Sequence, residues 1–542
     1  MSKHRIEVGT SSIRIHNYDW GDSERLERQF SVWNLTCHRY DPFGMSYDED
    51  QRILYLPRGI DLYYVQGCLK VSTEELVFLK PNAYEEFDGV KLKYGPRDAL
   101  QKEAIRFMLG LAEYQKNNQY SCLLVSSTTG FGKSYCSIFT MVYTHRKSCV
   151  ITYSLSILDQ WADYIFKYTN MKKDDVYLIK GSDSINMILK ERTKYMSSKV
   201  YLVSHATLRD YGNTYGWDKI DLLFKKIKVG NVFIDEAHRE FDNICKINAH
   251  INVYKTYFVT ATPARSSDAE NRIYQKAMKN VPTISLYNPD INKHINYIAM
   301  KYYSDPNPRD KSDMFNMYGI DKNKYVNYVV HQPNFYKILR VVMNMVIKAN
   351  GPCVFFIDTN EAILVVYKWL LINYPEFSGD IGLFSGLVSS DVKAEEKQKR
   401  LILTTMKSGS TGEDIAGLKM AVVLAAPFKS TVTAIQCAGR LRDSGTYFIE
   451  LVDLSFQSLA KFYYHKLPTY NQYMLSVTDY NFSRQKLNEK AEDLEYQQTS
   501  RNSKVPIRAV DERFGIGIFP LILYTDDEAD ELLKKMRERP EG

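Results

Sequence analysis

The residues with the clearest chemical purpose lie in the segment 125–134, which reads V-S-S-T-T-G-F-G-K-S. An apolar run, 122–125, precedes it and an amphipathic run, 135–143, follows, so we expect a strand, a glycine-rich turn and a helix. In that geometry, successive backbone N–H groups and the helix N-terminus face a bound polyphosphate. Lys133 can reach the β and γ phosphates, and the Ser134 hydroxyl can ligate Mg²⁺. Position 127, where the usual pattern has its first glycine, is Ser. An ordinary strand-to-helix turn therefore remains an alternative interpretation of this segment alone.

A second reactive stretch, 231–238, reads N-V-F-I-D-E-A-H. Its apolar residues predict a buried strand that ends at two adjacent carboxylates. Asp235 is placed to hold Mg²⁺ through water, and Glu236 to polarise the water that attacks a γ-phosphate. His238 is either an ordinary buried polar residue or, as we favour, a link to the next motif. That motif is T-A-T-P at the end of strand 257–259, where the short hydroxyl residues Thr260 and Thr262 can bridge the acidic pair to a neighbouring domain.

Composition bounds the class of protein. A chain of 542 residues is too long for one core and predicts three or four domains. A net charge of +7 fits a protein that meets a polyanion along one groove. No 18-residue apolar window and no apolar leader is present, which predicts neither a membrane span nor a secretion signal. Eight scattered cysteines without a C-x-x-C pair predict reduced thiols in a cytoplasmic protein.

The first half of the chain divides near residue 89. Residues 1–88 predict a small α+β domain with strands at 12–15, 53–56 and 63–65 and a helix at 23–30. This domain either recognises a substrate, which we favour, or only braces its neighbour. From residue 90, strands (149–153 and 200–203 among them) alternate with amphipathic helices, which is typical of a parallel α/β sheet. Gln101, on a helix just before the phosphate loop, is placed to read an adenine edge, although a lone Gln on a helix is usually solvated.

The second half repeats this alternation from residue 335, after a polar segment at 285–333 that reads as a linker or an insertion. No second glycine-rich phosphate loop occurs, so we expect a similar fold without nucleotide chemistry of its own. Its contribution would be Arg440 and Arg442, which it would supply across a cleft, because a planar guanidinium matches phosphate oxygens. The C-terminal residues 525–528 form a capping box before a helix with Ala529, Leu532, Leu533 and Met536 on one face. That face docks on the chain itself or on a partner.

Taken in order, these motifs resemble those of the superfamily 2 helicases over residues 90–475. The set is Gln101, T-G-F-G-K-S, S-L-S-I-L-D-Q-W, S-H-A-T-L, D-E-A-H, T-A-T-P, S-T-G-E-D and Q-C-A-G-R-L-R. Within that superfamily the chain is most similar to the XPB and RecG-like group and to phage UvsW-type DNA helicases. The resemblance implies an N-terminal accessory domain (1–88), a RecA-like lobe (89–284), a linker or insertion (285–333), a second RecA-like lobe (334–475) and a C-terminal extension (476–542).

The resemblance also implies a role for each motif residue. The ATP site would comprise Gln101, Thr128, Thr129, Gly130, Phe131, Gly132, Lys133, Ser134, Gly412, Asp414 and Gln436, with Mg²⁺ on Ser134 and Asp235. Catalysis would use Lys133, Asp235, Glu236, Arg440 and Arg442; coupling would use His238, Thr260 and Thr262. The residues that track one nucleic-acid strand would be Ser154, Gln160, Trp161, Ser204 and Thr207. The usual last motif ends Q-x-x-G-R-x-x-R, whereas position 443 here is Asp, so which of Arg440 and Arg442 serves as the arginine finger stays open.

The resemblance therefore implies an ATP-dependent DNA helicase or translocase that moves 3′ to 5′ and acts in replication, recombination or repair. Its partners would be single-stranded or branched DNA, and replication or recombination proteins at the C-terminal helix. It also favours a phage or viral source, hence the host cytoplasm. Three alternatives remain at this stage: an RNA helicase, a duplex translocase that does not separate strands, and a nucleic-acid-binding scaffold with an inactive ATPase.

Overall fold

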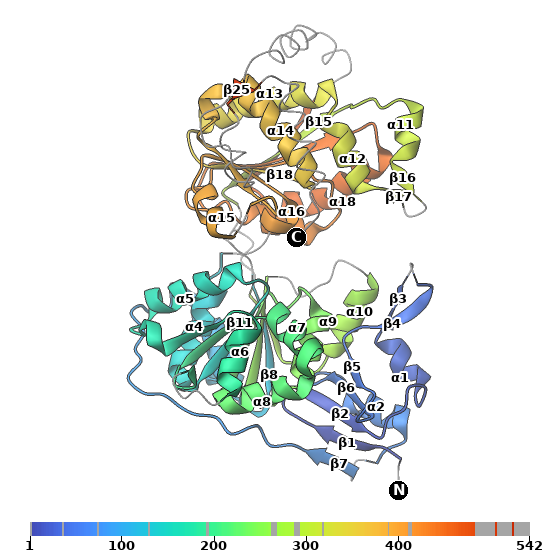
Figure 1. Cartoon of the computed structure of the whole chain (residues 1–542), viewed down its shortest axis with the longest axis vertical. Helices are drawn as coiled ribbons and strands as arrows, with labels where there is room; N and C mark the ends of the chain where they lie inside the picture. The colour runs from blue at the N-terminus through green and yellow to red at the C-terminus, as the bar shows by residue number, and fades with distance from the viewer. Residues whose placement is uncertain are drawn as a thin grey trace. The chain divides into compact units, whose positions relative to one another are not determined.

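The computed structural model divides the chain into two compact units, Met1–Tyr287 and Asn288–Gly542 (Figure 1). The structure describes residues 3–34, 37–72, 75–127, 130–190, 195–261, 268–286, 293–316, 319–388, 390–409, 415–482, 505–506 and 523–524. Each unit is built around one seven-stranded sheet. The first unit carries an additional five-stranded sheet at its N-terminal end.

That N-terminal sheet has the strand order β5-β6-β2-β1-β7, with antiparallel pairs except for β1 and β7. Its strands are β1 (Arg5–Val8), β2 (Ser12–His16), β5 (Ser46–Asp48), β6 (Ile53–Pro57) and β7 (Leu76–Phe78). A separate hairpin joins β3 (Ser31–Asn34) and β4 (Arg39–Pro42), and the helices are α1 (Glu24–Gln29) and α2 (Leu62–Leu69). The predicted strand at 63–65 is wrong, because the Asp61 side chain accepts from the N–H groups of Tyr63 and Tyr64 and starts helix α2 there.

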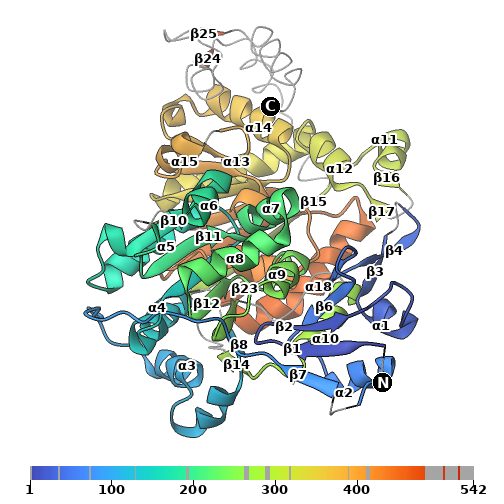
Figure 2. The ribbon, with the colours of Figure 1, turned by 60° about the horizontal axis from the view of Figure 1, so that its bottom comes forward.

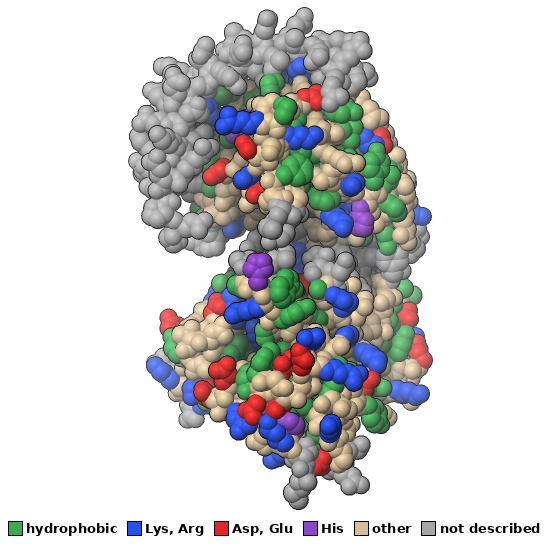
Figure 3. Space-filling model, turned by 90° about the vertical axis from the view of Figure 1, so that its right-hand side faces the viewer, with side chains coloured by type: hydrophobic (Ala, Val, Ile, Leu, Met, Phe, Trp, Pro, Cys, Tyr) green, Lys and Arg blue, Asp and Glu red, His purple; other side chains and the backbone are tan. Residues whose placement is uncertain are grey.

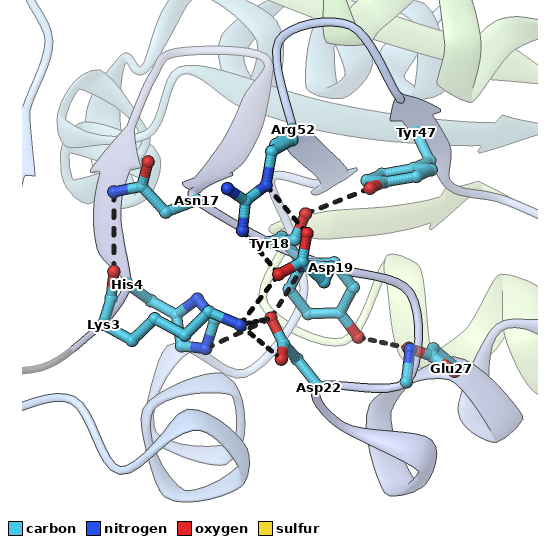
Figure 4. Close-up of polar contacts among 10 residues, drawn as sticks. Lys3, His4, Asn17, Tyr18, Asp19, Asp22, Glu27, Tyr47 and Arg52 are labelled. Atoms are coloured by element: carbon cyan, nitrogen blue, oxygen red, sulfur yellow. Dashed lines mark hydrogen bonds and ion pairs between the residues drawn. The ribbon is translucent and has the colours of Figure 1, made fainter.

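A polar network holds the start of this domain together (Figure 4). The Asp19 carboxylate accepts from Lys3 Nζ at 3.0 Å and from Arg52 Nε at 2.7 Å. These ion pairs are exposed and contribute little to stability. The Tyr18 hydroxyl, by contrast, is buried and donates to Glu27 Oε1 at 2.6 Å, so it ties the turn before α1 to that helix.

The main sheet of the first unit has the order β10-β11-β9-β12-β13-β8-β14, and all its pairs are parallel. Its strands are β8 (Cys122–Ser127), β9 (Ser148–Thr152), β10 (Val176–Ile179), β11 (Val200–Ser204), β12 (Asn231–Asp235), β13 (Lys255–Thr260) and β14 (Thr283–Leu286). Buried residues of α3 (Ala99–Leu109), α4 (Lys133–Thr144) and α5 (Ser156–Tyr168) pack in one core with strand residues such as Leu123. The opposite core contains α6 (Gly181–Leu189), α7 (His205–Tyr215), α8 (Trp217–Ile227), α9 (Phe241–Ala249) and α10 (Asp268–Ala277).

The N-terminal sheet belongs to this second core, since its buried residues and those of α9 form one continuous cluster. Figures 1 and 2 both show α9 beside β6 and β2. Hydrogen bonds reinforce the packing: the Ser12 hydroxyl donates to the Ala249 carbonyl, and the Asp242 carboxylate accepts from the backbone of Gly44 at 2.8 Å. The N-terminal domain is therefore fastened to the helix that follows the D-E-A-H motif.

The second unit has a parallel sheet of order β19-β20-β18-β21-β22-β15-β23. Its strands are β15 (Ile295–Tyr302), β18 (Cys353–Ile357), β19 (Ile381–Phe384), β20 (Leu401–Thr404), β21 (Met420–Ala425), β22 (Thr446–Asp453) and β23 (Ser476–Asn481). The helices are α11 (Pro308–Asp313), α12 (Lys322–Val329), α13 (Pro333–Ala349), α14 (Asn360–Asn373), α15 (Ser390–Glu396), α16 (Met406–Gly409), α17 (Thr431–Ala438) and α18 (Gln457–Tyr473). Short pairs β16 (Phe315–Asn316) with β17 (Gly319–Ile320) and β24 (Val505–Pro506) with β25 (Leu523–Tyr524) complete the elements.

Two parts of this unit differ from the prediction. The segment 285–333 is not a separate linker: Leu286 still pairs in the first sheet, and β15 is an interior strand of the second. The extension predicted from residue 476 begins with β23, which pairs with β15. The predicted C-terminal helix with Ala529 and Met536 lies outside the described residues. The chain thus has the predicted fold class, two tandem RecA-like lobes with a small N-terminal strand domain.

Three further observations concern the surface charges, the possibility of a membrane span and the cysteines. On the face of the first unit in Figure 3, lysine and arginine side chains are interspersed with acidic ones. Among the described helices, none is both long and apolar enough to pass through a membrane. All eight cysteines are free thiols, and six of them are buried.

Candidate active site

The strand order brings the predicted catalytic motifs of the first unit to one edge of its sheet. β13 lies between β12 and β8, so the phosphate loop after β8, Asp235 at the end of β12 and Thr260 at the end of β13 are neighbours. The carboxyl edge of a parallel sheet is where ligands bind in open α/β folds. Three motifs that are far apart in sequence therefore form one site.

The phosphate loop has the backbone geometry of an anion cradle. Gly130 and Gly132 have φ values of 84° and 96°, the left-handed region that favours glycine. Helix α4 begins at Lys133 without any side-chain cap, which leaves its first N–H groups for a ligand. Lys133 Nζ donates to the Ser127 carbonyl at 3.4 Å, so the ammonium group lies over the start of the loop. Thr128 and Thr129 lie outside the described residues.

Gln101 is buried beside this loop and holds it. Its amide nitrogen donates to the Phe131 carbonyl at 2.8 Å, and its amide oxygen accepts from the Arg97 backbone at 2.8 Å. Both the nitrogen and the oxygen of this amide therefore form hydrogen bonds within the protein, whereas we predicted that they bind the adenine edge. A Cβ at Gly132 would lie 2.4 Å from the Gln101 amide nitrogen, so the glycine is also required for this close approach.

Arg97, which precedes α3, also contacts the phosphate loop, and its role was not predicted from the sequence. One guanidinium nitrogen donates to the Phe131 carbonyl at 3.2 Å, and the other approaches the Gly130 carbonyl at 3.5 Å. Its side chain is mainly exposed beside the loop. The only signal in the sequence was a basic residue four positions before Gln101, which is too common a pattern to single out.

The acidic pair combines two carboxyl groups in different environments. The Asp235 Oδ1 atom accepts from the Glu236 backbone at 3.0 Å, and Oδ2 accepts from the Trp161 indole at 2.9 Å. Burial and the charge of Glu236 raise the pKa of Asp235 to about 6, against the opposing effects of the Trp161 hydrogen bond and Lys133. Burial also acts on Glu236, but the positive charges of Lys133, His238 and Arg239 outweigh it and hold the pKa of Glu236 below its usual value.

A short polar chain links Glu236 to the neighbouring strand. His238 Nδ1 lies 3.2 Å from Glu236 Oε2 and 2.7 Å from the Thr260 hydroxyl. His238 and Thr260 are both buried. The structure thus brings the D-E-A-H motif into contact with Thr260, and the coupling role of these residues stays a prediction. Thr262, the other residue predicted for coupling, lies outside the described residues.

The predicted nucleic-acid contacts are distributed differently from the expectation. Trp161 is only 2% exposed and faces Asp235, so its side chain belongs to the acidic pair and not to a nucleic-acid surface. Ser204 and Thr207 are buried and hydrogen-bond each other at 2.9 Å, because Ser204 caps helix α7. Ser154 and Gln160 are partly exposed, and the Gln160 amide donates to the Tyr164 hydroxyl. The side chains of Trp161, Ser204 and Thr207 are therefore internal, and the contact of their motifs with nucleic acid stays a prediction.

In the second unit, the last motif follows helix α17. Gln436 and Arg440 are buried, whereas Arg442 is exposed. Asp443, which replaces the expected arginine, forms an ion pair with Lys419 at 2.8 Å. Gly412 and Asp414 lie outside the described residues. The two arginines thus differ in accessibility within their own unit, and Arg442 is the one that solvent reaches.

The site of the first unit fits a nucleotide with a divalent cation. The loop offers backbone N–H groups at the uncapped start of α4, and Ser134 supplies a hydroxyl in the first turn of that helix. Asp235 supplies a buried carboxyl group whose raised pKa shows that ionisation is unfavourable there. A bound cation would offset this, because its positive charge favours the ionised carboxylate. Oxygen donors of this kind suit Mg²⁺, which keeps several of its waters.

Sheet order, phosphate loop and acidic pair together define a nucleotide-binding, RecA-like protein. Comparison with known families agrees: residues 94–265 match the family described as type III restriction enzyme, res subunit. The chain is also 26% identical, over 145 residues, to the Rad25-type DNA 3′–5′ helicase of Haloarcula marismortui. That alignment spans 27% of this chain and only 20% of the relative's length. Over these residues the chain is similar to proteins of helicase superfamily 2.

Solved structures show weaker similarity. Dbp5 of S. cerevisiae, bound to RNA and ADP BeF3, has a TM-score of 0.47 at 14% identity, with 74% of this chain and 97% of that chain covered. T4 UvsW has a TM-score of 0.32 at 13% identity, with 88% and 100% covered. Both scores lie below 0.5, so these similarities carry no weight for function.

Proposed function

We propose that this helicase-family chain is a nucleic-acid-dependent ATPase that acts on DNA, translocating 3′ to 5′ and unwinding or branch-migrating it in replication, recombination or repair. One observation supports the proposal above the others. The phosphate loop, the acidic pair and the His238–Thr260 contact converge at one edge of the first sheet. A site that only bound phosphate would not need Glu236, nor its contact through His238 with Thr260 on the neighbouring strand.

In this proposal the residues of the first unit divide the work of hydrolysis. The loop N–H groups and Lys133 bind and orient the phosphates. Ser134 and Asp235 would hold Mg²⁺, which supplies charge neutralisation on the phosphate oxygens when bound. Glu236, kept ionised by the surrounding positive charges, orients the attacking water and accepts its proton.

Coupling is proposed to run from Glu236 through His238 to Thr260, because these side chains are in contact. One arginine of the last motif is proposed to stabilise the negative charge that develops on the transferred phosphate. Since Arg442 is exposed in its own unit and Arg440 is buried, we assign the finger role to Arg442 and a structural role near it to Arg440.

The choice of DNA over RNA, and of 3′ to 5′ movement, is supported by the name of the Haloarcula marismortui relative and by the motif resemblance. The N-terminal domain is proposed to recognise DNA, and the C-terminal extension to contact replication or recombination proteins. Three outcomes would replace this proposal: ATP hydrolysis stimulated by RNA, movement on duplex DNA without strand separation, and nucleic-acid binding without ATP hydrolysis.

The test is ATP hydrolysis by the purified chain with no nucleic acid, single-stranded DNA, forked DNA, duplex DNA or RNA, each at two salt concentrations. We expect forked or single-stranded DNA to stimulate most, and the stimulation to fall with salt because phosphate contacts release counterions. Lys133→Ala is the negative control that excludes a contaminating ATPase. Stimulation by RNA alone would transfer the function to RNA, and hydrolysis that Lys133→Ala leaves unchanged would refute the assigned site.

A further inference from the structure

Trp161 makes a contact that the roles assigned above do not explain. Its indole N–H donates to Asp235 Oδ2 at 2.9 Å, from a side chain that is 2% exposed. An indole N–H is a donor without acceptor capacity, so it can orient a carboxylate but cannot compete with it for a cation. A buried aromatic that served packing alone would not need to present its one polar atom to this carboxylate.

The second oxygen of Asp235 is held as well. Oδ1 accepts from the Glu236 backbone at 3.0 Å, where the chain leaves β12 with Glu236 at a φ of 50°. Each oxygen of the carboxylate thus has one fixed donor and keeps its remaining acceptor sites for water or a cation. Outer donors of this kind fix the orientation of a ligating group and tune its affinity for metal.

Trp161 also connects Asp235 to the partly exposed segment 153–155. It lies in helix α5, five residues after the first helical residue, Ser156. The segment 153–155 leads directly into that helix, and Leu155 within it is 47% exposed. A helix is rigid over five residues, a rise of about 7.5 Å, so a ligand that displaces the segment 153–155 also displaces the indole relative to Asp235.

We propose that Trp161 is a positioning residue for Asp235, and that nucleic acid bound at the segment 153–155 acts through it on the affinity of the acidic pair for a divalent cation. This inference rests on the proposed function, because it needs Asp235 to serve a nucleotide-bound cation. It adds a route by which nucleic acid stimulates hydrolysis from within the first unit.

The test compares Trp161→Phe with Trp369→Phe in the full chain. Trp369 is 9% exposed, and its indole N–H has no hydrogen-bond partner among the described residues, so its replacement removes a buried indole without removing such a bond. The readout is Mn²⁺ binding in the presence of ADP, followed by the electron paramagnetic resonance signal of free Mn²⁺. We expect Trp161→Phe to weaken Mn²⁺ binding about 10- to 100-fold and Trp369→Phe to leave it unchanged.

A second substitution guards against loss of folding. Benzothienylalanine at position 161 keeps the shape of the indole and replaces its N–H by sulfur, and it should weaken Mn²⁺ binding as Trp161→Phe does. Mn²⁺ affinity within twofold of the wild type for this variant would overturn the positioning role. If affinity falls but the ratio of ATPase rates with and without single-stranded DNA is unchanged, the route through 153–155 is overturned. If the wild-type chain binds no Mn²⁺ with ADP, the proposed function itself fails, and this inference with it.

Discussion

Asn252 makes the contact between the N-terminal domain and the first lobe that is most directly open to a stability test. Its Oδ1 atom accepts from the backbone N–H and the hydroxyl of Thr10, both at 2.9 Å, and its Nδ2 donates to the Lys80 carbonyl at 2.6 Å. The side chain is buried. A hydrogen bond of this kind contributes about 1 kcal/mol net, so Asn252→Ala should cost about 3 kcal/mol of local stability for its three bonds.

Hydrogen exchange of the full chain is the suitable assay, because it reports opening of the strands beside Thr10 and Lys80 separately from global unfolding. A loss of about 3 kcal/mol corresponds to a roughly 100-fold drop in protection. Thr10→Val is the matched control: it keeps the backbone N–H and removes one of the three bonds, so it should cost about a third as much. A change below about 0.5 kcal/mol for Asn252→Ala, within the range of neutral substitutions, would show that the docking does not depend on this side chain.

Three further predictions concern the active site and pH. Glu236→Gln should lower kcat for ATP about 10²- to 10⁴-fold while nucleotide binding persists; stimulated hydrolysis in a clean preparation would contradict its assigned role. Gly132→Ala should weaken ATP binding at least tenfold by titration, because a Cβ strains a backbone with φ of 96° and meets Gln101; unchanged affinity would show that the loop adapts. Burial lowers the pKa of His250 from 6.5 to about 4, so the unfolded chain takes up a proton first as the solution is acidified. The chain should therefore lose roughly 3 kcal/mol between pH 6.5 and 4 in urea titrations, and His250→Gln should remove that loss; an equal loss in the variant would assign it to other groups.

Much of the first unit could be predicted from its sequence, because local patterns encode local structure. The strand before the phosphate loop and the helix after it are present at 122–127 and 133–144. Errors arose where a single side chain or a distant partner decided the outcome. Asp61 caps a helix where the short run 63–65 had indicated a strand. β15 was not predicted, because it lies in the largely polar segment 285–333. Its place in the second sheet depends on pairing with β22 and β23, which are distant in the sequence.

The sequence by itself determined which residues carry the chemistry: the glycines of the loop, Lys133, and the adjacent Asp235 and Glu236 are legible in order and type. Only the tertiary structure decided what these residues touch. The motif resemblance placed Trp161 on a nucleic-acid strand, whereas the parallel order of β9, β12 and β13 places Asp235 within reach of its indole. The physical reason is that a hydrogen bond depends on distances of a few tenths of an ångström between groups far apart in the chain, and those distances exist only once the sheet has formed.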